Sequence, residues 1–296
     1  MKGARGVTQF FDLCQRRTPP NESPRGTMTN RIDLTLHEAR KAGRTILAPF
    51  MTVGYPDLDT SIDIAEAVLQ SGADLIELGV PFSDPLAEGP TIQMTSQHAL
   101  QQGVTLQRCI DAVRRLRERN ANAPVLLMGY YNPFLRPGLE SFVEEAAQAG
   151  VDGLIVPDLP PEEAAPLHEI CQRHGVHLVP LLAPTSTTDR IKQACQHAGG
   201  FIYCVSLTGV TGARAGLREG VEDLVDRIRL QTNLPILVGF GISTPAHVKE
   251  VSGFSDGAVF GSALIDTVAA LPKAEAVQAA REFVAAMRQG AGPDTD

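Results

Sequence analysis

The sequence has little that would mark it as a membrane, secreted or disulfide-stapled protein. None of its apolar runs reaches the ~20 residues that span a bilayer. The five cysteines are odd in number and include no C-x-x-C pair: Cys14, Cys109, Cys171, Cys195 and Cys204. This pattern argues against a disulfide framework and favours a soluble, cytoplasmic protein in a reducing compartment.

An excess of positive charge is also missing. The chain of 296 residues has a formal net charge of -8. Residues 1–27 hold five basic and two acidic side chains, a net of +3, so the rest of the chain carries -11. An acidic body argues against nonspecific binding to nucleic acid or anionic membranes. It still allows an anionic substrate, because backbone N–H groups can bind a phosphate without a basic side chain.

Metal-ligand spacing is absent as well. His174 and His177 are three residues apart, but no paired cysteines or acidic residues accompany them. Ordinary histidines at a helix end and in a strand explain this spacing better than a zinc site does. We therefore expect no metal in this chain.

The first 27 residues differ from the remainder. They lack the apolar core of a secretory signal, and their arginines give only a weak indication of an organelle address. Prolines and polar residues at 19–24 are typical of a linker, and a helical pattern starts after Met28. We expect a disordered extension over residues 1–27, a single domain over 28–288 and a flexible tail over 289–296.

Short apolar runs rich in Val, Ile and Leu recur along this domain. They cover residues 46–52, 75–78, 125–130, 153–156, 177–182, 201–206, 236–240 and 257–260. Most start 21 to 35 residues apart, with amphipathic segments between them, which predicts buried parallel strands alternating with helices. Eight such units predict an α/β fold of the (β/α)8 TIM-barrel type. An open doubly wound sheet, usually with five or six strands, remains an alternative on pattern alone.

Two details refine this expectation. Gly72-Ala73-Asp74 and Gly150-Val151-Asp152 each lead directly into a strand, as if one unit were repeated. The second and third runs start 50 residues apart, roughly one helix more than a standard unit needs. We expect additional helices in the loops and an extra N-terminal helix. Length added after a strand lies at the carboxyl end of a barrel, where active sites are found.

An acidic residue, Glu77, interrupts the second apolar run. A buried carboxylate is costly unless it is paired or functional, although an outward-facing glutamate at a strand end would explain it equally simply. The following loop contains three prolines and carries Asp84 and Glu88. These acids are either ordinary loop residues or part of a catalytic group at the barrel mouth.

Glycines end the last two strands. Gly239-Phe240-Gly241 and Gly261-Ser262 would let a phosphate approach the backbone at the place where barrels often bind one. A dinucleotide-binding motif does not fit, because Thr244 stands where its third glycine should be.

Several segments together resemble the tryptophan synthase alpha subunit family. The run ELGVPFSDPLA from Glu77, followed by GPTIQ from Gly89, is similar to the long signature of that family. PFMTVGYP from Pro49, YYNP from Tyr130, GVTG from Gly209 and GFGIS from Gly239 match further family segments in order. The resemblance extends from about residue 46 to 265.

This resemblance implies a reaction and its catalytic residues. The expected reaction is retro-aldol cleavage of indole-3-glycerol phosphate to indole and glyceraldehyde 3-phosphate. Glu77 would be the principal acid and base, and Glu88 would accept the indole N–H. The family usually has aspartate at the second position, so the carboxyl of Glu88 is one methylene further from the backbone. About 1 Å of misplacement can cost a hundredfold in rate.

The resemblance also implies binding residues and partners. Thr211 would contact the second carboxylate in a closing lid. Phe50, Tyr130, Leu182, Tyr203 and Phe240 would line the ring pocket, and Gly212 would join Gly239, Gly241, Gly261 and Ser262 at the phosphate. Pro56, Pro81, Asp84 and Asn132 would face a beta subunit in an α2β2 tetramer. No cofactor is expected in this chain, since pyridoxal phosphate would belong to the beta partner.

Three functional hypotheses remain open from the sequence. The chain can be the alpha subunit of such a complex, or a free-standing lyase with the same chemistry. It can also be a weakly active or non-catalytic regulatory subunit, an idea prompted only by Glu88.

Overall fold

The computed structural model describes residues 30–205, 214–239 and 241–292. The predicted extension at 1–27, the predicted site residues Thr211, Gly212 and Phe240, and the last four residues of the predicted tail lie outside these ranges. Within the described ranges, no helix combines the length and the apolar character needed to cross a membrane.

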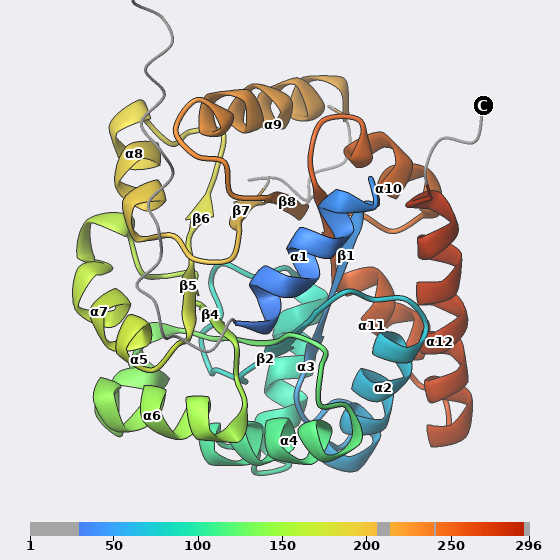
Figure 1. Cartoon of the computed structure of the whole chain (residues 1–296). Helices are drawn as coiled ribbons and strands as arrows, with labels where there is room; N and C mark the ends of the chain where they lie inside the picture. Colours follow the sequence, from blue (N-terminus) through green and yellow to red (C-terminus); the bar gives the residue numbers. More distant parts are fainter. Residues whose placement is uncertain (1–29, 206–213, 240, 293–296) are drawn as a thin grey trace, which may run out of the picture.

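Parallel strands form a barrel at the centre of the molecule (Figure 1). Their bounds are β1 Ile46–Thr52, β2 Ile76–Gly79, β3 Val125–Met128, β4 Gly153–Ile155, β5 His177–Val179, β6 Leu181–Leu182, β7 Ile202–Val205, β8 Ile236–Gly239 and β9 Gly257–Phe260. The strand order is β5-β4-β3-β2-β1-β9-β8-β7-β6. Every pairing between neighbouring strands of this sheet is parallel.

The fifth predicted strand is divided in two. Pro180 separates β5 from β6, since a proline has no N–H to donate to a neighbouring strand. Its carbonyl still accepts a hydrogen bond from the N–H of Tyr203 at 3.1 Å. Because β5 pairs with β4 and β6 pairs with β7, this segment closes the barrel. Because β5 and β6 together occupy one strand position, the nine strands correspond to the eight strands of the predicted (β/α)8 barrel.

Helices surround the barrel. They are α1 Arg31–Lys41, α2 Leu58–Gln70, α3 Pro90–Gln101, α4 Leu106–Arg119, α5 Tyr131–Leu135, α6 Leu139–Ala149, the 3₁₀ turn η1 Pro161–Glu163, α7 Ala165–Arg173, α8 Thr188–His197, α9 Arg214–Arg229, α10 Pro245–Ser252, α11 Ser262–Val268 and α12 Lys273–Gly290. The extra N-terminal helix is α1, and α3 fills the long gap after β2, as predicted. The last helix runs past the expected domain boundary at residue 288, and Ala291 is buried.

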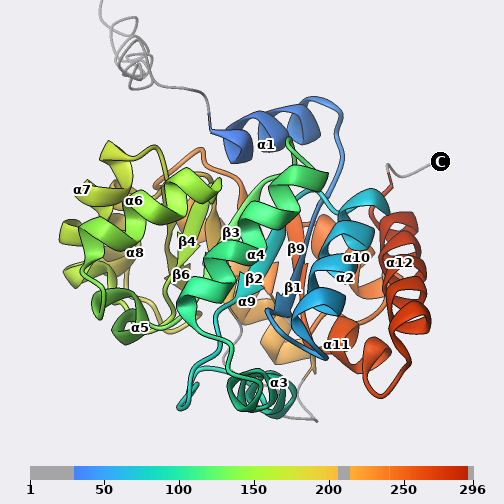
Figure 2. The same cartoon turned by 90° about the horizontal axis from the view of Figure 1, so that it is seen from below.

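The core has two layers. Side chains alternate along each strand, so Leu47 and Met51 of β1 pack outward against the helices, while Ala48 and Phe50 point into the barrel. The inner layer also contains Ile32, Leu36 and Ala39 from α1. This helix covers the amino end of the barrel, and α3 lies at the opposite end (Figure 2). The carboxyl end is therefore the end left for a site.

The repeated Gly-x-Asp pattern has a structural role. Asp152 precedes β4, and its Oδ2 accepts a hydrogen bond from the N–H of Val125, the first residue of β3, at 2.8 Å. Arg31 and Arg117 hold the same carboxylate. Two other aspartates, each at the start of a strand, repeat this arrangement: Asp74 binds the N–H of Leu47 and pairs with Arg44 and Arg288, and Asp256 binds the N–H of Ile236 and pairs with Arg40 and Arg229.

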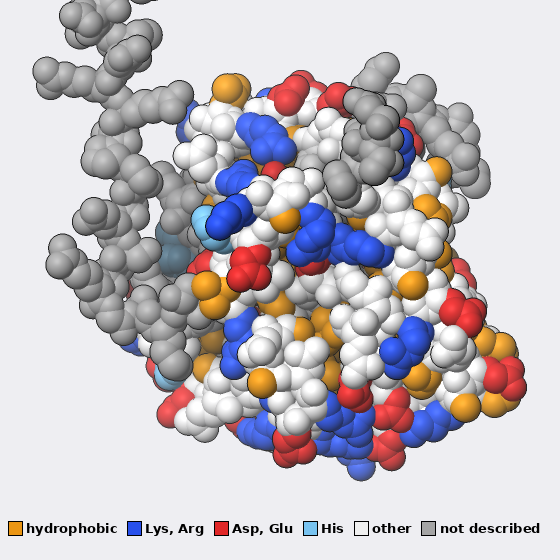
Figure 3. All heavy atoms as spheres, turned by 45° about the vertical axis from the view of Figure 1, so that its right-hand side comes forward, with side chains coloured by type: hydrophobic (Ala, Val, Ile, Leu, Met, Phe, Trp, Pro, Cys, Tyr) orange, Lys and Arg blue, Asp and Glu red, His pale blue; other side chains and the backbone are white. Residues whose placement is uncertain are grey.

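Ion pairs continue over the helical layer. Arg119 of α4 contacts Asp63 of α2 at 2.7 Å, and Lys273 contacts the same carboxylate at 2.7 Å. Figure 3 shows acidic and basic side chains interspersed on one face of the molecule. The acidic residues therefore do not form one continuous acidic patch on this face.

Candidate active site

Glu77 points into the barrel. Its neighbours Ile76 and Leu78 belong to the outer core layer, so alternation along β2 places the carboxyl on the inner side. The residue is fully buried, and neither carboxyl oxygen has a hydrogen-bond partner among the described residues. Burial, and then the charge of Glu88, raises the pKa of Glu77 well above its usual value. An unpaired buried carboxyl is rare unless it has a function.

Glu88 lies on the loop between β2 and α3. This loop is held at two points: the N–H of Ala87 donates to the Tyr130 hydroxyl at 2.8 Å, and the N–H of Phe82 donates to the Ser96 hydroxyl at 2.8 Å. The rings of Phe82 and Tyr130 stack with centroids 5.0 Å apart. Burial raises the pKa of Glu88 to about 7. The loop therefore presents a second carboxyl whose charge changes near neutral pH.

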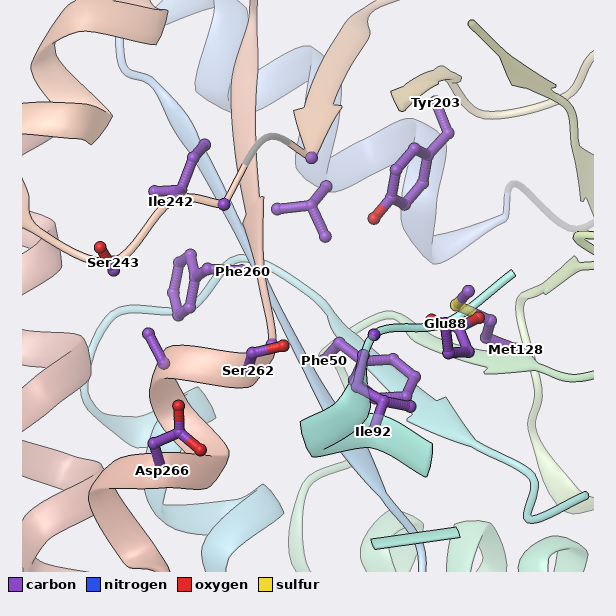
Figure 4. A pocket seen from close by; sticks show the side chains of 16 residues that line it. Phe50, Glu88, Ile92, Met128, Tyr203, Ile242, Ser243, Phe260, Ser262 and Asp266 are labelled. Atoms are coloured by element: carbon purple, nitrogen blue, oxygen red, sulfur yellow. The ribbon is translucent and has the colours of Figure 1, made fainter. Parts of the chain in front are cut away.

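A cavity of about 380 Å³ opens at the carboxyl end of the barrel. Glu88 and Met128 lie on one side of it, Ser262 and Asp266 lie on the other, and the hydroxyl of Tyr203 points toward the space between them (Figure 4). A second cavity of about 20 Å³ adjoins the first and shares Phe50 and Glu88 with it. The larger cavity is in the size range of small-molecule sites.

Four predicted phosphate residues line the larger cavity. They are Gly239, Gly241, Gly261 and Ser262. A side chain at Gly239 would meet the Tyr203 hydroxyl at 2.6 Å, and one at Gly261 would meet the Phe50 ring at 2.9 Å, so glycine keeps this end open. No side chain caps the start of α11 at Gly261. The first N–H groups of that helix lack intrahelical partners and are available to an acceptor.

The other predicted binding residues are distributed unevenly. Phe50 and Tyr203 line the larger cavity, and Tyr130 lines the smaller one. Burial, and then the charges of both glutamates, raises the pKa of Tyr203 well above its usual value. Leu182 lines neither cavity, because its side chain packs in the outer core layer while Leu181 packs against the inner one.

Glu77 itself lines neither cavity. Its register partners are Phe50 on β1 and Leu126 on β3. The charge of Glu88 acts on Glu77, and the charges of both glutamates act on Tyr203, so the three groups are close. In this state the carboxyl is adjacent to the ligand space rather than within it.

Sequence reasoning missed several lining residues. They are Ile92, Met128, Ile242, Ser243, Val259, Phe260, Ala263 and Asp266. Met128 could have been found by alternation from Tyr130 within the third apolar run, and Asp266 by its spacing of four from Ser262.

Among the described residues there is no cluster of three or more His, Cys, Asp or Glu side chains that could bind a metal.

The residues predicted to face a partner are only partly exposed. Asp84 and Asn132 are exposed, and Pro56 is half-buried with its carbonyl accepting from His98 and Gln102. Pro81 is buried and presents no side chain to a partner.

Comparisons with known proteins show the family of this chain. The family model "Tryptophan synthase alpha chain" matches residues 36–291. The tryptophan synthase alpha chain of Roseiflexus sp. (strain RS-1) is 50% identical over 259 residues, which is 88% of this chain and 99% of the relative. That of Geobacter sulfurreducens is 46% identical over 263 residues, or 89% and 99% of the two chains.

Solved structures give the same result. The crystal structure of tryptophan synthase subunit alpha from Legionella pneumophila str. Paris has a TM-score of 0.82 at 36% identity, covering 89% of this chain and 98% of that one. A chain of the aminoacrylate-bound tryptophan synthase of M. tuberculosis has a TM-score of 0.80 at 30% identity, covering 89% and 100%. Since sequence, fold and family model agree over nearly the whole described chain, the protein belongs to the tryptophan synthase alpha chain family.

Proposed function

We propose that Glu77 and Glu88 carry out the alpha reaction of this family, the cleavage of indole-3-glycerol phosphate to indole and glyceraldehyde 3-phosphate. The observation that supports this most is the fully buried Glu77 carboxyl, which has no hydrogen-bond partner among the described residues. It lies next to Glu88, and Glu88 lines a cavity whose opposite end is lined by glycines. Two acids at one end and an anion niche at the other match the two ends of this substrate.

The protonation of Glu77 suits the first step. Burial raises the pKa of Glu77, which favours the protonated carboxyl, and this form can give its proton to the ring carbon that bears the side chain. The resulting carboxylate then takes the proton of the side-chain hydroxyl. As that proton leaves, the carbon–carbon bond breaks, its electrons restore the aromatic ring, and the aldehyde forms. Glu77 ends the cycle protonated, as it began.

Glu88 suits the complementary role. Protonation of the ring carbon places positive charge on the indole nitrogen, and a carboxylate that accepts the ring N–H stabilises this charge. Glu88 lines both cavities, so the edge of an indole ring bound there would lie beside its carboxyl. For Glu77 to reach the ring carbon, its side chain must change rotamer, since it lines neither cavity.

The glycine-lined end would hold the phosphate. Gly241 has a positive φ of 54°, and the space where its side chain would lie is empty. The nearby serines Ser243 and Ser262 add hydroxyl groups to the same wall. Backbone N–H groups at such a wall can bind a phosphate without lysine or arginine.

A beta subunit is the proposed partner, in an α2β2 tetramer with pyridoxal phosphate in the beta chain. Apolar side chains stand exposed on the loop and helices near the barrel mouth: Leu86 is 89% exposed, Leu135 is 48% exposed and Met94 is 46% exposed. Together with the exposed Asp84 and Asn132, they form a surface suited to a protein partner. Docking there would place the partner where indole emerges.

The test of this function is an indole-release assay. The purified chain is given indole-3-glycerol phosphate with and without a tryptophan synthase beta subunit. We expect slow cleavage alone and faster cleavage with the partner. High activity that a beta subunit leaves unchanged would indicate a free-standing lyase. Tight substrate binding with no cleavage under either condition would contradict the catalytic assignment.

The pH dependence of kcat/KM should report the titration of Glu88. Its pKa of about 7 means that the carboxylate needed to stabilise the ring cation is lost as the pH falls through 7. We expect kcat/KM to rise with pH between about 6 and 8, with a midpoint near 7. The Glu88→Gln variant should have much lower activity and should lack this rise. The same rise in both proteins would assign the midpoint to another group.

Shortening Glu88 tests the geometry of the loop. The Glu88→Asp variant keeps the charge and withdraws the carboxyl by one methylene. We expect activity within about tenfold of the parent, or above it, because the charge is what stabilises the ring cation. The measurement is kcat for indole release. Complete inactivation would instead show that the loop backbone, held through Ala87 and Phe82, is adapted to the longer acid.

A further inference from the structure

The larger cavity has an unusual balance of charge for a phosphate site. Its described lining residues include two acids, Glu88 and Asp266, and no lysine or arginine. Glu88 is used in the chemistry proposed above. Asp266 is at the opposite side of the cavity, beside the residues assigned to the phosphate, and the proposed reaction gives it no role.

The position of Asp266 is well defined. It follows Ser262 by four residues on α11, so the two side chains lie on the same face of that helix. In Figure 4 it lies below Ser262, at the edge of the cavity. The Thr91 hydroxyl, in the first turn of α3, donates to its Oδ1 at 3.3 Å. Burial, and then the charge of Asp266, raises the pKa of Tyr55, so Asp266 also acts on the loop that carries Tyr55.

We propose that Asp266 determines how tightly this site holds phosphorylated ligands: its negative charge opposes the phosphate, weakens binding and speeds release of the phosphorylated product. The proposal rests on the function proposed above. Among the described lining residues, the niche without Asp266 would offer only backbone and hydroxyl donors, which favour a phosphate. With it, a like charge stands about one helical turn from the ligand.

The expected size of the effect follows from Coulomb's law. A dianion and a carboxylate separated by roughly 6 Å in a solvent-exposed site repel each other enough to weaken binding about three- to tenfold. This repulsion should shrink at high ionic strength, because Asp266 is exposed and salt screens it. A purely structural role for the residue would not show this dependence on salt.

The test uses the charge series Asp266→Asn and Asp266→Lys in the full chain. Inorganic phosphate is titrated by calorimetry, and KM and kcat for indole-3-glycerol phosphate are measured. We expect the phosphate affinity to increase about three- to tenfold in the asparagine variant and further in the lysine variant, with KM decreasing in parallel. Raising the salt concentration should narrow the difference from the parent chain.

Two controls separate charge from structure. Glu282→Gln removes an equal charge from an exposed site on α12, where the residue contacts Gln278, and should leave phosphate affinity unchanged. Thr91→Val removes the hydrogen bond to Asp266 and keeps its charge, so it should not tighten phosphate binding.

The outcomes distinguish the two proposals. If the parent chain binds phosphate and cleaves its substrate, but the asparagine variant binds phosphate no more tightly, the role of Asp266 is refuted and the function stands. Weaker binding in both variants of the series would show that Asp266 supports the niche. If the parent chain neither binds phosphate nor releases indole, the function itself fails.

Discussion

Replacement of Glu77 by glutamine should lower kcat for indole release by about 10³-fold or more, since general acid–base groups contribute about 10²–10⁴-fold. Glutamine has the size of a protonated glutamate but can neither give the ring carbon a proton nor take one from the hydroxyl. Phosphate affinity should persist, because Gly241 and Ser262 lie at the other end of the cavity. The measurements are single-turnover cleavage and calorimetric titration with inorganic phosphate.

The same variant has a second signature, in stability. Burial raises the pKa of Glu77 in the folded chain, so this group stabilises the fold fully below its unfolded pKa, and that contribution is lost as pH rises through the folded value. The glutamine variant does not titrate and should lose less stability than the parent as the pH rises above the unfolded pKa of glutamate. Undiminished turnover in this variant would remove Glu77 from the mechanism, whatever its stability.

Replacement of Asp152 by alanine should have the largest effect on folding. The carboxylate is 3% exposed and binds Arg31, Arg117 and the N–H of Val125. Without it, the mostly buried Arg117 guanidinium and a strand N–H lose their partner, and breaking a buried pair in this way costs about 3–5 kcal/mol. The measurement is the free energy of unfolding from urea titration.

A surface pair provides the control. Glu162 lies 3.4 Å from Arg190, and both side chains are more than 40% exposed. Glu162→Ala should change stability by less than about 1 kcal/mol, because exposed pairs contribute little. If both variants lost equal stability, the three aspartates that connect neighbouring strands would not be special sites of stabilisation.

The barrel could be predicted from the sequence because its physical signals are local. Most strand residues are buried, so the strands appear as largely apolar runs, and the Gly-x-Asp repeat shows where two of them begin. The division of the fifth strand was not predicted, although Pro180 was visible. Its consequence depends on which neighbour each half pairs with, and pairing is a property of the assembled sheet.

The site was predictable to a lesser extent. Glu77 stood out as an acid inside an apolar run, and Gly261-Ser262 stood out as a strand end. The family resemblance predicted Leu182 at the ring pocket, and the apolar run alone does not tell which of its residues face inward. The pairing of Leu182 with Cys204 places both in the outer layer, whereas Leu181 and Tyr203 face inward. Ile92 and Asp266 come from separate helices and meet only in the folded chain.

The helix α1 limits how ligands can reach the interior of the barrel. Ile32, Leu36 and Ala39 fill the amino end, so the described part of the barrel is closed at that end. In the proposed reaction, substrate and products therefore pass through the carboxyl end of the barrel, and a partner docked at that end would govern how fast the products leave and the next substrate enters.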